Sequence, residues 1–194
     1  MFIREKSEIK TNKLYYNFPI ILVGYKDDKF NYNATTTSAS YSLGNTINIG
    51  IKSDSNSTKL IKKYKEFTIN IPSKELMSEV EICGLFSGNN KLQQADMPYT
   101  IGKYVDAPLI DECIISFECK VVKSYDFEGY THFLGEIKRR IADKDLVAKD
   151  GSLKSEEIST IHYVGCSKER IYRYVSSDNA KTGTFTFGGH TSCG

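Results

Sequence analysis

The sequence contains no tryptophan, only four prolines and no long hydrophobic run. Its longest continuous apolar stretch, residues 20–23, is far too short to span a bilayer. The first six residues, MFIREK, lack the hydrophobic core of a secretion signal. We therefore expect a soluble, cytoplasmic protein that has no membrane partner.

Neither sign of charge is in large excess. The 26 Lys and Arg residues nearly balance the 24 Asp and Glu residues, which gives a net charge of +2, and the two signs are interspersed. A nucleic-acid-binding surface needs a stripe of basic residues to meet the phosphate backbone. The sequence therefore predicts no nucleic-acid partner.

The five cysteines form no CxxC pair, and their odd number argues against a closed disulfide framework. Cys83, Cys113 and Cys119 lie in apolar contexts, so we expect buried free thiols. In the C-terminal tail, His190 and Cys193 provide only two candidate metal ligands, which make a poor site. We predict no metal site.

Strand-forming segments dominate the chain, and its 194 residues fit a single domain over residues 1–194. Runs rich in Ile, Val, Phe and Tyr predict strands over residues 20–25, 46–51, 67–71, 114–122, 132–141, 161–164 and 171–174. Repeated short strands separated by polar turns are typical of a β-barrel. The expected fold class is mainly β, with short helices.

Two short helices are expected between these strands. The first covers residues 57–65, with Ser57 as its N-cap and lysines near its end. The second begins after Ser73, stops at Gly84 and buries Leu76, Met77, Val80 and Cys83. Residues 88–104 are polar and irregular, and we expect them to form a surface loop beside the functional site.

Three polar segments, residues 33–38, 52–57 and 66–70, lie at the edges of strand patterns, and we interpret them as turns. The first contains the small hydroxyl residues Thr35, Thr36, Thr37 and Ser38, past which a planar ligand can approach the backbone. The second places Lys52 and several hydroxyls before a helix start, where unpaired N–H groups and the helix dipole favour phosphate. Together they resemble a cradle for the phosphate and ring of a flavin.

The order and spacing of several motifs are similar to those of the flavin reductase-like, flavoredoxin-type family. The likeness covers roughly residues 14–185. It rests on residues 19–24, 33–38, 49–52, 57–61, 66–72 and 107–113, and on the dipeptides Cys83-Gly84 and Ser87-Gly88. The resemblance implies a split β-barrel that binds FMN and forms a homodimer across one barrel face.

The same resemblance implies an oxidoreductase that passes electrons from NAD(P)H, or from a small redox partner, to flavin or another small acceptor. The chain has no GxGxxG segment after a strand, so any NAD(P)H is expected to stack directly on the flavin. Two alternatives stay open. One is an FMN-binding electron-transfer protein without NAD(P)H turnover, and the other is a flavin-free barrel that binds another small molecule.

The resemblance also implies site residues. Lys52 and Ser57 match phosphate contacts, while Thr36 and Ser38 match hydroxyl contacts to the ring and Thr35 and Thr37 offer mainly backbone groups. The full set of cofactor contacts is Asn33, Thr35, Thr36, Thr37, Ser38, Lys52, Ser53, Ser57, Asn70 and Lys91. Lys91 is expected to be a second phosphate contact, although its loop is shorter than the family's and lacks the family's Asp.

His132 matches a histidine near the exposed flavin face, and it is the expected catalytic residue. Its role there is to position the nicotinamide or to protonate reduced flavin. Each implied contact also has a structural interpretation. Ser57 can simply cap a helix, the threonines can serve strand propensity, Asn70 can satisfy local backbone, and His132 can be structural.

Overall fold

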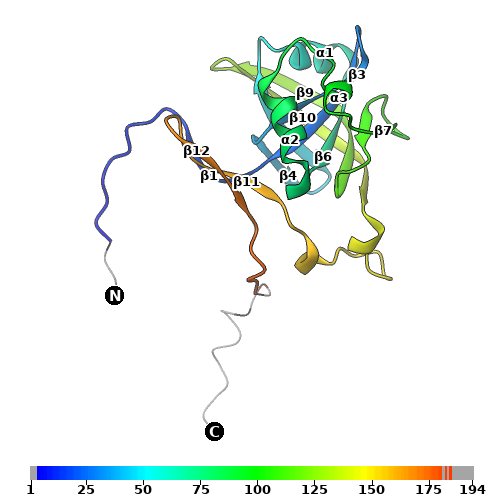
Figure 1. Ribbon diagram of the computed structural model, residues 1–194. Helices are drawn as coiled ribbons and strands as arrows, with labels where there is room; N and C mark the ends of the chain where they lie inside the picture. The colour runs from blue at the N-terminus through cyan, green and yellow to red at the C-terminus, as the bar shows by residue number, and fades with distance from the viewer. Residues whose placement is uncertain (1–3, 181, 183, 185–194) are drawn as a thin grey trace.

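The computed structural model describes residues 4–180, 182 and 184. The two candidate metal ligands of the C-terminal tail, His190 and Cys193, lie outside the described residues. Seven antiparallel strands form the main sheet. They span Ile21–Asp27 (β2), Asn31–Thr37 (β3), Ser40–Leu43 (β4), Thr46–Lys52 (β5), Glu66–Ile71 (β6), Ile115–Phe127 (β9) and Tyr130–Ala142 (β10). Their order is β3-β2-β6-β9-β10-β5-β4, and Figure 1 shows the sheet curling into a barrel.

The barrel closes where β3 leads into β4. The Thr37 hydroxyl donates to the Gly50 carbonyl at 2.8 Å, and the Gly50 N–H donates to the Ala39 carbonyl at 2.8 Å. These bonds hold one edge of the sheet against β5. The Lys52 end of β5 and the Thr35 part of β3 line a common cavity instead of pairing, so the barrel is split on this side.

The barrel interior is filled by apolar side chains that alternate along the strands. Its largest members include Tyr25, Phe67 and Phe133, which are at most 2% exposed. Gly135 makes room for this packing, because a Cβ added there would come within 2.6 Å of the Phe67 ring. Burial of this many apolar groups is the main stabilising term of the fold.

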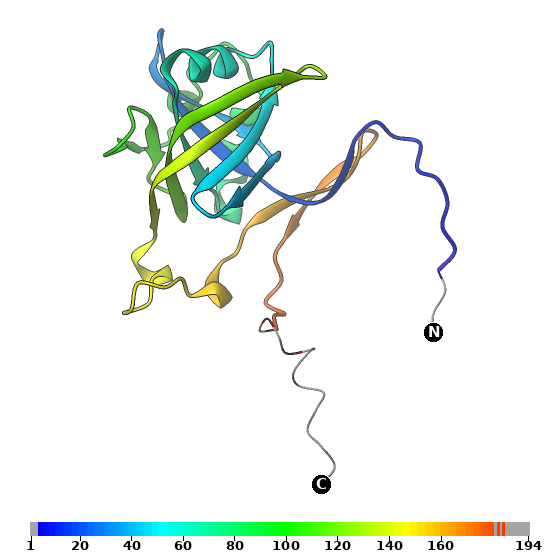
Figure 2. The same ribbon diagram turned by 180° about the vertical axis from the view of Figure 1, so that it is seen from behind.

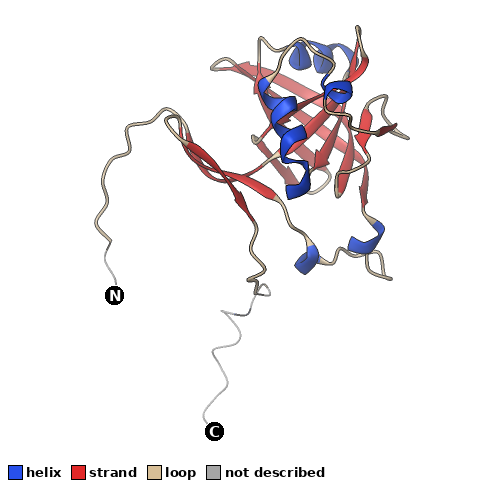
Figure 3. Cartoon of the chain, viewed as in Figure 1, coloured by secondary structure: helices blue, strands red, loops and turns tan. Residues whose placement is uncertain are grey.

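Helix α1 (Asn56–Tyr64) lies at one end of the barrel, as Figure 3 shows, and its Leu60 and Ile61 belong to the barrel core. Its N-cap is Ser55, whose hydroxyl accepts a hydrogen bond from the Thr58 N–H at 3.2 Å. The sequence prediction that Ser57 caps this helix is therefore wrong. The helix begins earlier because Ser55 has the extended backbone that a cap requires.

A second layer covers the outer face of the β2–β3 edge. It contains η1 (Lys74–Leu76), α2 (Met77–Leu85) and α3 (Lys91–Gln94), together with the hairpin of β7 (Tyr99–Ile101) and β8 (Pro108–Ile110). Ile20 and Leu22 point into this layer while Ile21 and Val23 point into the barrel, so this segment is buried on both faces. This explains the continuous apolar run at residues 20–23.

A separate sheet, which we call the arm, consists of β1 (Leu14–Pro19), β11 (Ile161–Cys166) and β12 (Arg170–Tyr174) in the order β1-β11-β12. Figures 1 and 2 show it extending sideways from the barrel. Two buried residues join it to the barrel, because the Ile20 N–H donates to the Ile161 carbonyl at 2.8 Å. Two short turns, η2 (Lys144–Leu146) and η3 (Ser155–Glu157), precede β11.

The mainly β class is confirmed, and each of the seven predicted strands corresponds to an observed one. The prediction of turns at residues 33–38 and 66–70 is wrong, since these segments are β3 with its end and β6. Residues 88–104 are not simply a loop, because they contain α3 and β7. Cys83, Cys113 and Cys119 are buried as predicted. Within the described residues, no helix has the length and hydrophobicity needed to cross a membrane.

Candidate functional site

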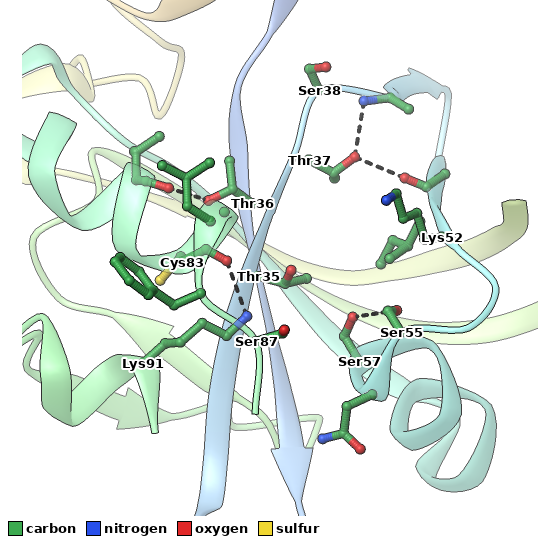
Figure 4. A pocket seen from close by; sticks show the side chains of 18 of the residues that line it. Thr35, Thr36, Thr37, Ser38, Lys52, Ser55, Ser57, Cys83, Ser87 and Lys91 are labelled. Atoms are coloured by element: carbon green, nitrogen blue, oxygen red, sulfur yellow. Dashed lines mark hydrogen bonds between the residues drawn. The ribbon is translucent and has the colours of Figure 1, made fainter. Parts of the chain in front are cut away.

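A cavity of about 1180 Å³ opens where the barrel is split. One side, which we call the barrel wall, consists of residues 35–38 of β3, Lys52, residues 55–57 at the start of α1, and Lys91. The opposite side, the arm wall, consists of Tyr15, Tyr163, Arg170 and Tyr172. In Figure 4, Lys91 and Cys83 lie on one side of Thr35, and Ser55 and Ser57 lie on the other.

The threonine segment lies on an edge strand, so alternate N–H and C=O groups point away from β2. The Thr36 hydroxyl donates to the Val80 carbonyl at 2.7 Å, and the Thr37 hydroxyl closes the barrel. Thr35 and Ser38 have no recorded side-chain bond within the described residues and line the cavity. Thr36 lines the cavity too, so its contact with the ring stays a prediction, and the Thr35 hydroxyl is available as well.

The start of α1 carries the features of an anion site. The Ser57 hydroxyl lies 3.0 Å from that of Ser55, and both residues line the cavity with Lys52. The N–H groups of Asn56 and Ser57 have no acceptor among the described residues. The first N–H groups of a helix lack intrahelical partners and carry the positive end of its dipole. Lys52 and Ser57 are therefore brought together as expected.

Lys91 lies on the other side of Thr35 and is only 6% exposed. Its ammonium donates to the Cys83 carbonyl at 3.1 Å, which is its one recorded hydrogen bond within the described residues. Burial lowers the pKa of Lys91 and raises the pKa of the Cys83 thiol to about 11. At neutral pH Cys83 is thus a thiol and a poor nucleophile, whereas Lys91 supplies donors at the cavity surface.

Asn33 and Asp27 hold the barrel wall together. The Asn33 side-chain oxygen accepts from the backbone N–H groups of Ala34 at 3.0 Å and Lys91 at 3.1 Å. The buried Asp27 carboxylate accepts weakly, at 3.4 Å, from the side-chain amides of both Asn33 and Asn56. Asn33 therefore positions the backbone of Lys91. Asp27 connects Asn33 to Asn56 at the start of α1.

Asp27 was not expected at the site, and its sequence neighbourhood gives only one signal. The predicted strand run is followed by Asp27-Asp28, a turn-type pair in which Asp27 Oδ1 accepts from the N–H groups of Lys29 and Phe30. The bonds to Asn33 and Asn56 depend on tertiary contacts. They could not be found by spacing alone.

Ser53 and Asn70 are not brought to the cavity. The Ser53 hydroxyl accepts from Thr131 at 3.1 Å. Asn70 is fully buried, and its side-chain oxygen accepts from the Ile110 N–H at 3.0 Å and the Ser116 hydroxyl at 2.9 Å. Both predictions of cofactor contact are corrected, because neither residue lines the cavity and protein groups already satisfy the Asn70 side chain.

His132 also lies outside the residues that line the cavity. It is opposite Gly50 in the β5–β10 pair, and its ring stacks on Tyr125 with centroids 4.8 Å apart and 7° between the planes. The structure thus places the expected catalytic residue on the outer barrel face, beside the cavity rim at Gly50. Its catalytic role stays a prediction.

The arm wall is aromatic and basic, and sequence analysis did not predict it. The rings of Tyr163 and Tyr172 stack with centroids 5.2 Å apart, and Tyr15 meets Tyr163 edge-on at 5.8 Å. The Arg170 guanidinium lies 4.3 Å from the Tyr163 ring centroid. The sequence predicts β11 and β12. The pairing of β11 with β1, however, joins residues almost 150 positions apart.

Comparison with known proteins agrees with this architecture. Residues 15–156 match the model of the flavin reductase like domain. The chain belongs to this family. The fold is the split barrel of flavin reductase-like proteins, which confirms the fold predicted from the sequence.

Two curated relatives, both uncharacterised archaeal proteins, match part of the chain. A protein of Pyrococcus abyssi is 37% identical over 79 residues, which is 41% of this chain and 46% of the relative. A protein of Archaeoglobus fulgidus is 38% identical over 80 residues, which is 40% of this chain and 45% of the relative. The match thus spans about half the length of these relatives.

Solved structures resemble the chain over nearly its whole length. Flavoredoxin of Desulfovibrio vulgaris has a TM-score of 0.83 and 24% identity, covering 95% of this chain and all of that one. Flavoredoxin from Methanosarcina acetivorans has a TM-score of 0.82 and 22% identity, covering 94% and 99%. An FMN-binding protein from Thermus thermophilus has a TM-score of 0.73 and 16% identity, covering 93% and 99%.

Proposed function

We propose that this protein binds FMN in the cavity and acts as a flavoprotein oxidoreductase of the flavin reductase and flavoredoxin type. One observation carries the proposal. In a chain of the flavin reductase-like family, the barrel wall gathers the start of α1, an edge strand of small hydroxyl residues and the buried Lys91 around one cavity. Similar folds include two flavoredoxins and an FMN-binding protein.

The residues at the start of α1 fit a phosphate group. The unpaired N–H groups of Asn56 and Ser57, the Ser57 hydroxyl and the Lys52 ammonium supply donors and positive charge to one region. Asp54 is the exposed acid of this region, whereas Asp27 is held by four hydrogen bonds. We propose that this region holds the FMN phosphate.

The β3 edge and Lys91 fit the remainder of the cofactor. Thr35 and Ser38 offer hydroxyls, and the strand edge offers backbone donors and acceptors of the kind that a flavin ring with its carbonyl groups needs. Lys91 places a positive charge at the cavity surface, which stabilises an anionic group or added electron density.

When bound, a flavin ring supplies the redox chemistry, because it takes up a hydride and passes electrons onward. The protein residues orient the ring, limit water access and set its potential by hydrogen bonds. A general base is not required for this chemistry. The lack of an activated nucleophile at Cys83 is therefore consistent with the proposal.

The proposed electron donor is NAD(P)H or a small redox partner, and the acceptor is flavin or another small molecule. With FMN in the barrel wall, the space between the ring and the arm wall is open to the second substrate. The electron-transfer alternative differs only in the donor, since such a protein would not react with a pyridine nucleotide.

We also propose that the protein forms a homodimer. Large apolar side chains are exposed on the outer face of β4 and β9, with Leu43 at 69%, Phe127 at 64%, Tyr41 at 60% and Tyr125 at 54%. Exposed apolar groups gathered on one barrel face favour association with a second copy. Sedimentation equilibrium of the wild-type protein and of Phe127→Glu tests this, and a monomer at micromolar wild-type protein would contradict it.

The decisive experiment is a titration of FMN into the purified protein stripped of flavin, followed by anaerobic addition of NADH or NADPH. Saturable FMN binding supports the cofactor assignment, and its absence refutes the proposal. Bleaching of the flavin absorbance by either nucleotide supports the reductase function. FMN binding without bleaching by either nucleotide would favour the electron-transfer alternative.

A further inference from the structure

The arm wall forms part of the same cavity as the proposed FMN site, yet its chemistry is different. Tyr15, Tyr163 and Tyr172 provide aromatic surface there, and Arg170 provides a guanidinium. The barrel wall, by contrast, is lined mainly by hydroxyls, backbone groups and ammonium groups. A single ligand does not need two such different surfaces, so the arm wall is a candidate second binding site.

Geometry makes the arm wall a platform for a flat molecule. Tyr163 and Tyr172 are stacked at 5.2 Å with an interplanar angle of 29°. The Arg170 guanidinium lies over two rings, at 4.3 Å from the centroid of Tyr163 and 5.4 Å from that of Tyr15. Guanidinium planes and tyrosine rings both stack on planar ligands, and stacking on tyrosine keeps the guanidinium edge open for hydrogen bonds.

The charge of this platform is not neutralised by the protein. No carboxylate lies within 4.0 Å of Arg170 or Lys13 among the described residues. The recorded hydrogen bond of Arg170 is a long one, at 3.4 Å to the Tyr15 hydroxyl. A hollow of about 530 Å³ adjoins Lys13 and Arg170 and adds Lys168 and one acid, Glu169. This end of the cavity therefore favours an anion.

A hydrogen bond fixes the platform against the barrel layer. The Tyr172 hydroxyl donates to Glu81 of α2 at 3.0 Å, so this carboxylate has a protein partner. On the other side of the cavity, Asp28 is paired with Lys63 at 2.7 Å. Glu81 and Asp28 are thus engaged with protein partners and are poorly placed to compete for Arg170.

We propose that the arm wall binds the second substrate, and that this substrate is a planar aromatic molecule carrying a carboxylate or a phosphate. Its ring packs against the aromatic surface of the arm wall, and its anionic group meets Arg170. The inference rests on the proposed function for the meaning of the second substrate. A guanidinium binds carboxylate and phosphate with the same paired geometry, so a small aromatic acid and a nucleotide are two sources of one chemistry.

The test compares two matched pairs of ligands by calorimetry with FMN-saturated protein. Nicotinate and nicotinamide differ in one carboxylate, whereas nicotinamide mononucleotide and nicotinamide riboside differ in one phosphate. In wild-type protein we expect the anion of at least one pair to bind about tenfold tighter than its partner. In Arg170→Gln this preference should disappear. The pair that shows it identifies the source.

Arg173→Gln is the matched control, because Arg173 lies on the same strand but alternates to the other face and does not line the cavity. It should retain the anion preference. Equal binding of both members in both pairs, or a preference that survives in Arg170→Gln, would overturn the inference. FMN affinity is measured for every variant. Failure of wild-type protein to bind FMN refutes the proposed function instead, and the pairs are then titrated against the flavin-free protein.

Discussion

The two walls of the cavity are built in opposite ways. The barrel wall is held in place by the buried residues Asn33, Asp27 and Lys91, and it is supported by the packed barrel. The arm wall belongs to a three-stranded sheet whose Arg170 is exposed. The rigid side suits a cofactor that stays in place. The thin and exposed side suits a ligand that must enter and leave.

The largest expected effect tests whether the barrel carries the stability of the molecule. Phe133 is fully buried in the barrel, so Phe133→Ala should lower the free energy of unfolding by about 3–5 kcal/mol. In the arm, Tyr172→Phe removes one hydrogen bond and should cost about 0.5–1.5 kcal/mol. Urea unfolding followed by circular dichroism measures both. Similar losses of unfolding free energy in the two variants would mean that the barrel does not dominate the stability of the molecule.

The next effect concerns the phosphate region of the barrel wall. The double variant Lys52→Ala with Ser57→Ala should weaken FMN binding about 10- to 100-fold, because it removes a charge and a donor. Riboflavin, which lacks the phosphate, should change less than about threefold. Lys59→Ala, on the exposed face of the same helix, is the control. Equal losses for both ligands would show that the phosphate lies elsewhere.

Much of the barrel could be predicted from the sequence, whereas the cavity could be predicted only in part. Runs rich in Ile, Val, Phe and Tyr predict β2, β5 and β10. The threonine segment has the composition of a turn, because its polar residues face a cavity instead of a core. Asn70 was assigned to the site from a motif, since a motif does not show that Ile110 and Ser116 satisfy the side chain.

Lys91 gives a smaller effect that depends on pH. Burial holds its pKa below the usual 10.5 in the protein without FMN, and the acceptor groups and negative charge of bound FMN would stabilise the ammonium and raise that pKa. FMN binding is then linked to proton uptake between the two values. FMN affinity should therefore fall as the pH rises through the lowered pKa toward 10.5. Lys91→Met should bind FMN more weakly at neutral pH and show a flatter profile, and an unchanged profile would remove Lys91 from the site.

The smallest effect is expected at His132, which lies on the outer face of the barrel opposite Gly50. His132→Gln should change FMN affinity less than about twofold, because the ring contacts Tyr125 and does not line the cavity. Anaerobic stopped-flow reduction by NADPH measures its part in turnover. A tenfold slower reduction at unchanged FMN affinity would support the catalytic role predicted from the sequence.

The arm and the barrel are joined by a very short connection. Pro19 ends β1, Ile21 begins β2, and the intervening Ile20 is fully buried and bonded to Ile161. Side chains alternate in direction along a strand, so one inserted residue here would turn Tyr15 of β1 away from the cavity. Homologues that gain or lose a residue at this junction should therefore accept different substrates, even where every cofactor contact is kept.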